Sequence, residues 1–247
     1  SNYSDDEHVE IVNRIQDSIQ AGQLYQLNFG RKWKGELSED PWLTMLRLAK
    51  KNPSPFASWM IIPDQGLAIC SSSPELLVSM KNGVVRTRPI KGTRPRGSDP
   101  IQETKLRQEL LDSNKEMAEH RMLVDLERND IALISKVGTV EHSAFQVEAY
   151  AQVQHLVSEV KGKISKQKDV WDVLCALFPG GSITGCPKTV TIAAIDEIEK
   201  EPRSFWTGSM GYIDPRNTSA GWNILIRTLE AHESKSGWNA TIQAGGG

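Results

Sequence analysis

The dipeptide Asn82-Gly83 constrains the fold of this chain more than any other short stretch. It separates two strand-like runs, 75–80 and 84–90. Asn-Gly favours the two-residue turn of a β-hairpin, because both turn positions require positive φ angles. We therefore expect neighbouring strands to pair antiparallel here.

The rest of the chain alternates between helical and strand-like patterns. Ser4 to Glu7 matches a capping box, and two Asp-Pro pairs each place an N-cap before a first-turn proline. The expected helices cover 5–21, 41–51, 100 to about 135 with a second cap at Ser113, 169–177 and 187–200. The expected strands, besides the hairpin, cover 23–29, 56–62, 67–71, 138–141, 144–150, 153–164, 204–213, 219–230 and 238–244. This predicts one α+β domain over residues 1–247, with antiparallel strands and helices packed outside.

Composition excludes several classes of function. The chain has 247 residues, 38% of them hydrophobic, and a net charge of −2, which argues against nucleic-acid and anionic-membrane binding. No apolar run reaches membrane-spanning length. The three cysteines, Cys70, Cys175 and Cys186, show no metal-type spacing, so reduced thiols in a cytoplasmic protein are expected.

The stretch TRPIKGTRPRG, residues 87–97, surrounds Lys91 with arginines, prolines and glycines where a hairpin strand runs out. Arginines close in space would disfavour the charged lysine and so favour a nucleophilic amine. Gly92 would let a substrate approach the backbone closely. A basic loop that only attracts anions explains the same residues, and chemistry alone does not separate the two interpretations.

Three acidic side chains and one histidine are further candidates. Glu116 and Glu119 lie on one face of an expected helix, where two carboxylates would suit Mg²⁺, although Glu116 could simply complete a capping box with Ser113. Glu75 would be a general acid if buried and an ordinary surface residue if exposed. His155 is either a site residue or a core histidine with satisfied hydrogen bonds.

The segment FPGGSITGCPK, residues 178–188, is a glycine-rich turn before an expected helix. It departs from the phosphate-binding loop of nucleotide-binding proteins, because Cys186 and Pro187 separate Gly185 from Lys188. What remains is a turn whose backbone N–H groups could hold an anionic group of a substrate.

Ten motifs occur in a fixed order between Leu24 and Gly247: LYQLNFG, NPSPF, SSSPELLV, RPIKGTRPRG, KEMAEHRMLVDLERND, VQHLVSEVKG, FPGGSITGCPK, GSMGYID, NILIRTL and IQAGGG. Together they resemble the chorismate-utilising enzymes, the family of anthranilate, aminodeoxychorismate, isochorismate and salicylate synthases. The resemblance implies two large antiparallel sheets packed as a sandwich with helices outside, an active site between them, and a requirement for Mg²⁺.

Two positions separate the branches of this family. The water-adding isochorismate and salicylate branch carries a lysine where this chain has Gln26, and glutamine cannot serve as that base. Anthranilate synthases typically carry alanine where this chain has Lys91, whereas many aminodeoxychorismate synthases carry lysine. The resemblance therefore implies component I of aminodeoxychorismate synthase, a transferase of the 4-aminobenzoate arm of folate biosynthesis. Anthranilate synthase and a non-catalytic chorismate-binding or subunit-docking module remain alternatives.

The resemblance also implies roles for individual residues. Lys91 matches a nucleophile toward C2 of chorismate, Glu75 the general acid for the C4 hydroxyl, and His155 a histidine near the departing group. Glu119 matches a metal ligand and Glu116 its partner. Substrate contacts are implied for Gly92, Thr93, Ser182, Lys188, Trp206, Arg227, Gly245 and Gly246, with Trp206 replacing a tyrosine of anthranilate synthases.

No cysteine lies in a glutaminase nucleophile turn. The resemblance therefore implies that ammonia comes from a glutamine amidotransferase subunit or a fused domain. Family members also carry an N-terminal part and a final helix with a second metal-binding glutamate. This sequence contains neither, so we expect it to be a fragment.

Overall fold

The structure is a computed structural model that describes residues 1–214, 216 and 219–247. A 3₁₀ turn covers Pro63–Gln65. The helices of the described residues are α1 (Asp5–Gln20), α2 (Pro41–Lys51), α3 (Pro100–Asp112), α4 (Asn114–Ala132), α5 (Val170–Leu177), α6 (Gly181–Thr184) and α7 (Lys188–Ile198).

Two large sheets carry most of the strands, and all their pairs are antiparallel. The six-stranded sheet has the order β13 (Gly211–Asp214), β14 (Ser219–Asn223), β5 (Leu76–Lys81), β6 (Val84–Arg88), β11 (Val160–Lys163) and β8 (Glu141–His142). The five-stranded sheet has the order β2 (Phe29–Leu37), β16 (Gly237–Gly246), β15 (Thr228–Ser234), β4 (Leu67–Ser71) and β3 (Ser58–Ile62).

Two smaller antiparallel sheets lie near the junction of the large ones. One has the order β7 (Ile90–Pro95), β10 (Val153–Val157) and β9 (Gln146–Ala149), and the other pairs β1 (Gln26–Leu27) with β12 (Gly185–Cys186). The α+β fold with two large antiparallel sheets is thus confirmed.

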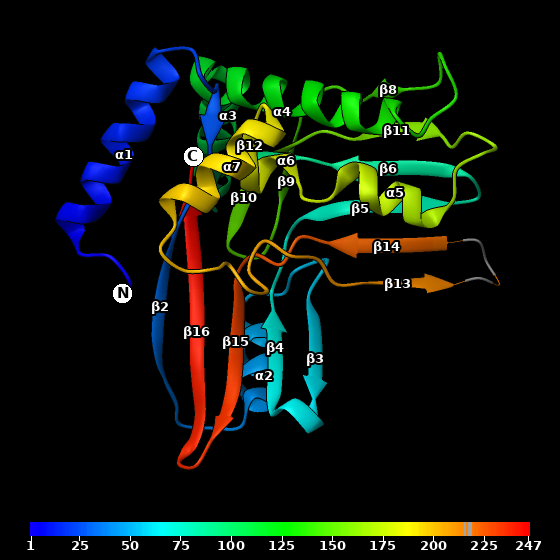
Figure 1. Cartoon of the computed structure of the whole chain (residues 1–247). Coiled ribbons are helices and arrows are strands. Elements are labelled where there is room, and N and C mark those ends of the chain that lie inside the picture. The colour runs from blue at the N-terminus through cyan, green and yellow to red at the C-terminus, as the bar shows by residue number, and fades with distance from the viewer. Residues whose placement is uncertain (215, 217–218) are drawn as a thin grey trace.

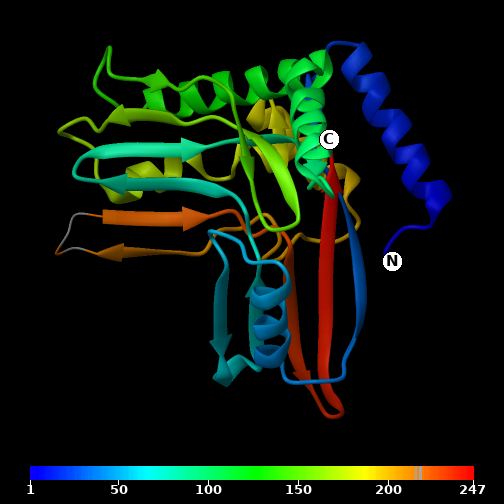
Figure 2. The same cartoon turned by 180° about the vertical axis from the view of Figure 1, so that it is seen from behind.

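The two large sheets run in different directions. In Figure 1 the strands of the six-stranded sheet run across the view, whereas those of the five-stranded sheet run from top to bottom and project below the rest of the molecule. Figure 2 shows the same arrangement from behind, with α2 against the five-stranded sheet. The chain passes from one sheet to the other between β4 and β5 and again between β14 and β15.

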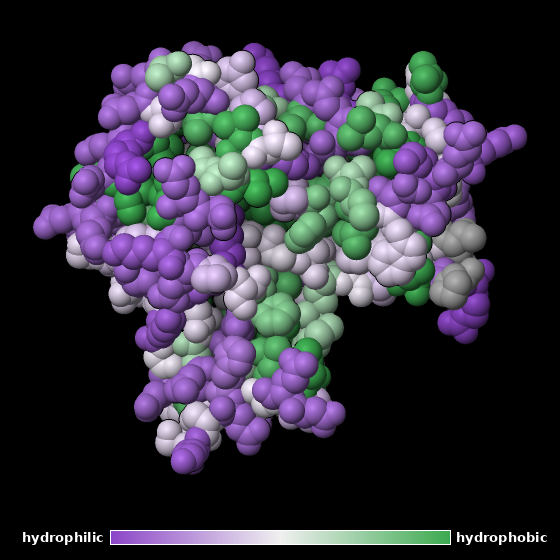
Figure 3. All heavy atoms as spheres, viewed as in Figure 1, coloured by the Kyte–Doolittle hydropathy of each residue, from purple (hydrophilic) through white to green (hydrophobic). Residues whose placement is uncertain are grey.

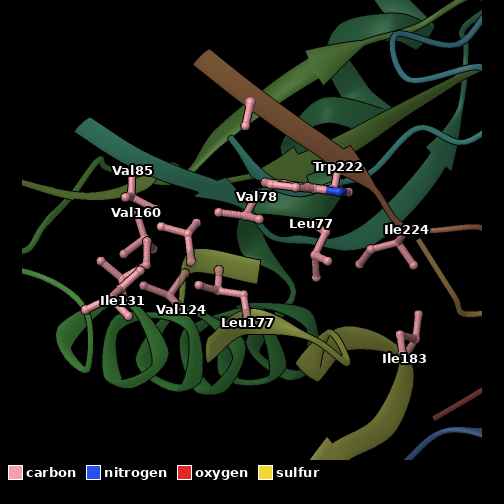
Figure 4. Packing of buried hydrophobic residues seen from close by; sticks show 13 residues of the cluster. Leu77, Val78, Val85, Val124, Ile131, Val160, Leu177, Ile183, Trp222 and Ile224 are labelled. Atoms are coloured by element: carbon pink, nitrogen blue, oxygen red, sulfur yellow. The ribbon is translucent and has the colours of Figure 1, made fainter. Parts of the chain in front are cut away.

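The main core lies between the six-stranded sheet and the helices α4, α5 and α6 (Figure 4). Val78, Val85 and Trp222 from the sheet are buried against Val124 and Leu177 from the helices. Burying an aliphatic side chain of this size contributes about 1.5–3 kcal/mol. Figure 3 shows further apolar side chains on the surface over α5 to α7.

Local sequence signals explain several of the element boundaries. Ser4 forms the expected capping box with Glu7, and Asp40 and Asp99 cap α2 and α3 ahead of their first-turn prolines. Asn82 and Gly83 have φ angles of 52° and 74°, and Lys81 pairs with Val84, so the hairpin prediction is confirmed.

Other boundaries differ from the sequence-based expectation. The run 153–164 is two strands, β10 and β11, which belong to different sheets. The run 219–230 is likewise divided into β14 and β15, and the run 204–213 is strand only from Gly211 onward. Within the expected strand 23–29, Tyr25 is 68% exposed whereas Gln26 is buried, because this chain segment is held by hydrogen bonds to the glycine-rich turn.

Candidate active site

The candidate residues lie where the chain leaves one sheet for another. Lys91 is not in a loop after the hairpin, because Pro89 interrupts the strand and Ile90–Pro95 forms β7 of the three-stranded sheet. Glu75 precedes β5, His155 lies on β10, and Arg227 lies between β14 and β15. These segments meet near the junction of the two large sheets (Figure 1).

Glu75 is the buried acid of this group, with 6% of its surface exposed. Its backbone is fixed from two sides, since its N–H donates to the Ser73 hydroxyl and its carbonyl accepts from Ile224. Burial raises the pKa of its carboxyl to about 7, against opposing contributions from Ser182, the Ile90 backbone, Lys91 and Arg227. The hydroxyl oxygen of Ser182 is buried and has no hydrogen-bond partner among the described residues. A carboxyl with this pKa can hold a proton near neutral pH and release it.

Lys91 and Glu119 form an ion pair, with 3.4 Å between Nζ and Oε2. Lys115 reaches the other oxygen of Glu119 at 3.8 Å, but it is 82% exposed whereas Lys91 is 20% exposed. The arginines of the surrounding stretch pair with acids of their own. These pairs are Arg88 with Glu148, Arg94 with Glu116, and Arg96 with Glu103.

Glu116 does not complete a capping box. Its backbone N–H donates to the Ser113 hydroxyl, but its carboxylate binds Arg94 at 2.7 Å. Its second oxygen is buried, has no hydrogen-bond partner among the residues that the structure describes, and faces Gly92, whose φ angle of 91° suits glycine. A side chain in place of Gly92 would also meet Leu110, so the glycine lets β7 pass close to α4.

His155 and Arg227 meet in a second contact group. His155 is 2% exposed, and its Nδ1 lies 2.9 Å from the Thr93 hydroxyl while its Nε2 lies 3.4 Å from the Arg227 guanidinium. Burial and the neighbouring Arg227 charge lower the pKa of the imidazole to about 4. Thr93 and Arg227 themselves are exposed, so they can reach a ligand above the buried histidine.

The first residue of α7, Lys188, forms an ion pair with an acid that the sequence analysis did not single out. Lys188 binds Asp130 of α4 at 2.5 Å. The neighbouring Glu127 is buried, and one of its carboxyl oxygens has no hydrogen-bond partner in the described part of the chain. Burial, above all, raises the pKa of Glu127 to about 8, and Asp130 adds to the effect. The signal for Glu127 was present in the sequence, since it falls at helical spacing between the apolar residues Leu123 and Ile131.

The glycine run at the end of β16 borders a groove of about 820 Å³. Gly245 and Gly246 pair with Gly30 and Phe29 of β2, and the groove also reaches Gln26 and Glu119 but neither Glu75 nor Lys91. Gln26 is buried and its amide has no partner among the described residues. Trp206 is buried with its ring against Gly30 and Gly245, so it supports the glycine run from one side.

The carboxylates fit Mg²⁺ in kind and in number. Within residues 1–214, 216 and 219–247, no group of three or more acidic, histidine or cysteine side chains is arranged to hold a metal. Mg²⁺ usually takes only one or two protein carboxylates and completes its shell with water and substrate oxygens. Glu119, and the unpaired oxygen of Glu116, are compatible with that mode of binding.

Comparison with known proteins identifies the family of this chain. The sequence model of a family described as chorismate binding enzyme matches residues 1–247. This chain belongs to the chorismate-binding enzymes. It is 39% identical over 246 residues to aminodeoxychorismate synthase component 1 of Bacillus subtilis (strain 168), which covers 99% of this chain and 51% of the relative.

Other relatives of this chorismate-binding enzyme bear a different name. An anthranilate synthase component I-like protein of Synechocystis sp. is 44% identical over 227 residues, covering 91% of this chain and 46% of the relative. The crystal structure of anthranilate synthase component I from Streptococcus pneumoniae TIGR4 superposes with a TM-score of 0.87 at 32% identity, covering 99% of this chain and 53% of that one.

The chain spans about half the length of the curated relatives it matches. The family is therefore established, whereas the names of its relatives divide between two reactions. In the part of the chain that the structure describes, no helix has both the length and the apolar character needed to cross a membrane.

Proposed function

We propose that this chain is the catalytic part of an aminodeoxychorismate synthase component I. The reaction joins chorismate and ammonia to give 4-amino-4-deoxychorismate and water, with the enolpyruvyl group retained. The observation that supports this proposal is the position of Lys91, whose amine lies beside Glu119 and within electrostatic reach of the buried, proton-holding carboxyl of Glu75.

The first half of the reaction uses Lys91 and Glu75. Lys91 first releases to water the proton of its ammonium group, which pairs with Glu119. Its neutral amine then attacks C2 of chorismate, the two conjugated ring double bonds shift, and the C4 hydroxyl leaves with a proton from Glu75 as water. Burial raises the pKa of Glu75 to about 7, so near neutral pH a substantial part of the carboxyl is protonated and can act as this general acid.

In the second half, ammonia adds at C4, the two ring double bonds shift back, and the bond between C2 and Lys91 breaks. Lys91 leaves as the amine, and the proton lost from the incoming ammonia restores the acid. Atoms and charges therefore balance over the cycle, and Lys91 and Glu75 return to their starting states.

Chorismate carries two carboxylates, and the site offers cationic and N–H groups for both. Arg227 would hold the pyruvyl carboxylate, since a guanidinium donates two parallel hydrogen bonds to such a group. Thr93, Ser182, Lys188 and the backbone of Gly245 and Gly246 would contact the rest. Glu119 and Glu116 would hold Mg²⁺, which when bound neutralises the ring carboxylate.

Ammonia would come from a glutamine amidotransferase, as a separate subunit or a fused domain. None of the cysteines of this chain suits the hydrolysis of glutamine. Cys70 is buried and its pKa is raised to about 12, while Cys175 and Cys186 lie in helix- and strand-forming segments. A thiolate is the nucleophilic form of cysteine, so a thiol with a raised pKa is a poor nucleophile.

The identity of the product tests the proposal. The full-length protein is incubated with chorismate, MgCl₂ and ammonium chloride, and the products are separated and weighed by mass spectrometry. We expect an aminated product that keeps the enolpyruvyl group, without release of pyruvate. Anthranilate with one equivalent of pyruvate would overturn the proposal.

Anthranilate synthase component I is the second candidate. The Streptococcus pneumoniae structure, at 32% identity, carries that name, and the Synechocystis relative, at 44% identity, is named an anthranilate synthase component I-like protein; these names favour it. The same assay separates the two candidates, because only formation of anthranilate releases pyruvate.

A further inference from the structure

His155 lies at the centre of the three-stranded sheet, and strand register fixes its neighbours. On one side it pairs with Thr93 of β7, and on the other with Glu148 of β9. The imidazole therefore has one edge toward Thr93, at 2.9 Å from Nδ1, and the other toward Arg227, at 3.4 Å from Nε2.

The hydrogen-bond donors and acceptors that face the two ring nitrogens determine which nitrogen carries the proton. A guanidinium has donors only, so Nε2 of His155 can take part in the contact with Arg227 only as the acceptor. The single proton of the neutral ring then sits on Nδ1, where the Thr93 hydroxyl accepts it.

Arg227 has a backbone that is held in place and a side chain with one hydrogen-bond partner among the described residues. Its φ angle is 50°, in the left-handed region that costs a residue with a side chain about 1 kcal/mol or more. Its carbonyl accepts from the Ser72 N–H at 3.1 Å, so the backbone is held in this conformation. The side chain is exposed, and among the described residues it makes one hydrogen bond, the contact with His155.

We propose that His155 is a positioning residue: a neutral imidazole with its proton on Nδ1, whose Nε2 lone pair fixes the guanidinium of Arg227 in the orientation that receives a carboxylate of the substrate. The identity of that substrate rests on the proposed function. In this arrangement His155 donates no proton to the substrate through Nε2, and its contribution is to binding.

The charges around the ring agree with a neutral imidazole. Arg227 repels a second positive charge at 3.4 Å, and burial lowers the pKa further, to about 4. Glu148 would favour the charged form, but its carboxylate is already engaged by Arg88 and by the Tyr150 hydroxyl. Tyr150 packs its ring against His155 and adds no charge near neutral pH, because its own pKa is raised to about 12.

Nuclear magnetic resonance of the free protein tests the proton assignment without any substrate. The chain has five histidines, and a long-range ¹H–¹⁵N spectrum of ¹⁵N-histidine-labelled protein separates protonated from bare ring nitrogens, with His155→Gln identifying the signal. We expect Nδ1 protonated and Nε2 bare from about pH 5.5 to 8. A proton on Nε2, or a doubly protonated ring at pH 7, would overturn the proposal even if the reaction were confirmed.

Two variants then separate positioning from proton transfer. His155→Gln keeps an acceptor oxygen near the place of Nε2 but removes imidazole acid–base chemistry, whereas His155→Leu removes the acceptor as well. Loss of a hydrogen bond to a charged group predicts a KM for chorismate raised about tenfold or more in His155→Leu, and a KM close to wild type in His155→Gln. An equal loss of kcat in both variants with KM unchanged would contradict the proposal.

Circular dichroism and thermal unfolding of both variants show whether the fold is intact. Should neither variant fold, the tautomer measured in the wild-type protein decides the question alone. A failure of the proposed reaction is recognised separately, since it changes the product and leaves the NMR result unaffected.

Discussion

The site contains two kinds of carboxyl group, in two regions of the molecule. Glu75, in the connection between β4 and β5, and Glu127, on the inner face of α4, are buried and have raised pKa values of about 7 and 8. Glu116 and Glu119, on the face of α4 turned to β7, keep partial exposure and bind Arg94 and Lys91.

Surroundings rather than residue type give these groups their chemistry. Burial without a full counter-charge favours the protonated carboxyl, which can donate a proton, whereas an adjacent cation favours the carboxylate, which can bind a metal. One helix, α4, contributes to both regions, because its faces point to different environments. Lys91 lies between the two regions, and this makes it the first residue to test.

Lys91→Ala should have the largest effect. Removal of a covalent nucleophile costs on the order of 10⁴-fold or more in kcat, and the fold should persist because Lys91 is on a partly exposed strand. Formation of the aminated product from chorismate and ammonium is the measurement.

Lys115→Ala is the matched control, since Lys115 also lies within 4 Å of Glu119 but is 82% exposed. An exposed ion pair of this kind contributes less than about 1 kcal/mol, so activity should stay near wild type. Equal losses in the two variants would mean that charge near Glu119, and not a nucleophile, is what the reaction needs.

Glu75→Gln should follow, with kcat lowered about 10²- to 10⁴-fold, the usual contribution of a general acid. The slope of the wild-type pH–rate profile should change near pH 7, because the proton on Glu75 is lost there, and this change should be absent from Glu75→Gln. The pH–rate profile is the measurement, and a wild-type profile with no change of slope between pH 6 and 8 would argue against Glu75 as the acid.

Glu127→Gln should act on stability. The pKa of Glu127 is about 8 in the folded protein and 4.5 when exposed, so the stabilisation is fully present below about pH 4.5 and is lost as the pH rises toward 8. At pH 8.5 the variant should exceed the wild type by on the order of 3 kcal/mol in free energy of unfolding. Urea denaturation at pH 5 and pH 8.5 measures this difference, and an equal effect at both pH values would contradict the assignment.

Glu119→Gln should have the smallest of these effects. Because Glu119 is a proposed ligand of Mg²⁺, the variant should lose Mg²⁺ affinity by at least about tenfold. Titration calorimetry in the absence of substrate is the measurement. Asp125→Asn, on the same helix but paired with Arg128 away from the site, is the control. Unchanged Mg²⁺ affinity in Glu119→Gln would mean that Glu119 is not a ligand of Mg²⁺.

Much of the local structure could be predicted from the sequence because its signals are local. The caps at Ser4, Asp40 and Asp99 and the Asn82-Gly83 turn act through hydrogen bonds and φ angles within a few residues. The α+β class followed from them, and the order of the motifs indicated the family.

The remaining features depend on pairings between distant segments. The strand breaks at 158–159 and 224–227 come where the chain changes sheets, and no turn residue there signals the change. The contacts of Arg94 with Glu116 and of His155 with Arg227 require the register of β7 and β10 and the position of α4. A one-dimensional pattern does not contain that information.

A rapid-quench experiment tests the central claim, that Lys91 forms a covalent bond with the substrate, most directly. The full-length protein is mixed with chorismate and MgCl₂ without ammonia, and the reaction is quenched in acid. The protein is then digested, and the mass of the peptide containing Lys91 is measured by mass spectrometry. We expect this peptide to carry the added mass of chorismate less one water, and to lose it after a chase with ammonium. The adduct on another residue, or an unmodified Lys91 peptide at each time point while the same sample aminates chorismate once ammonium is added, would contradict the claim.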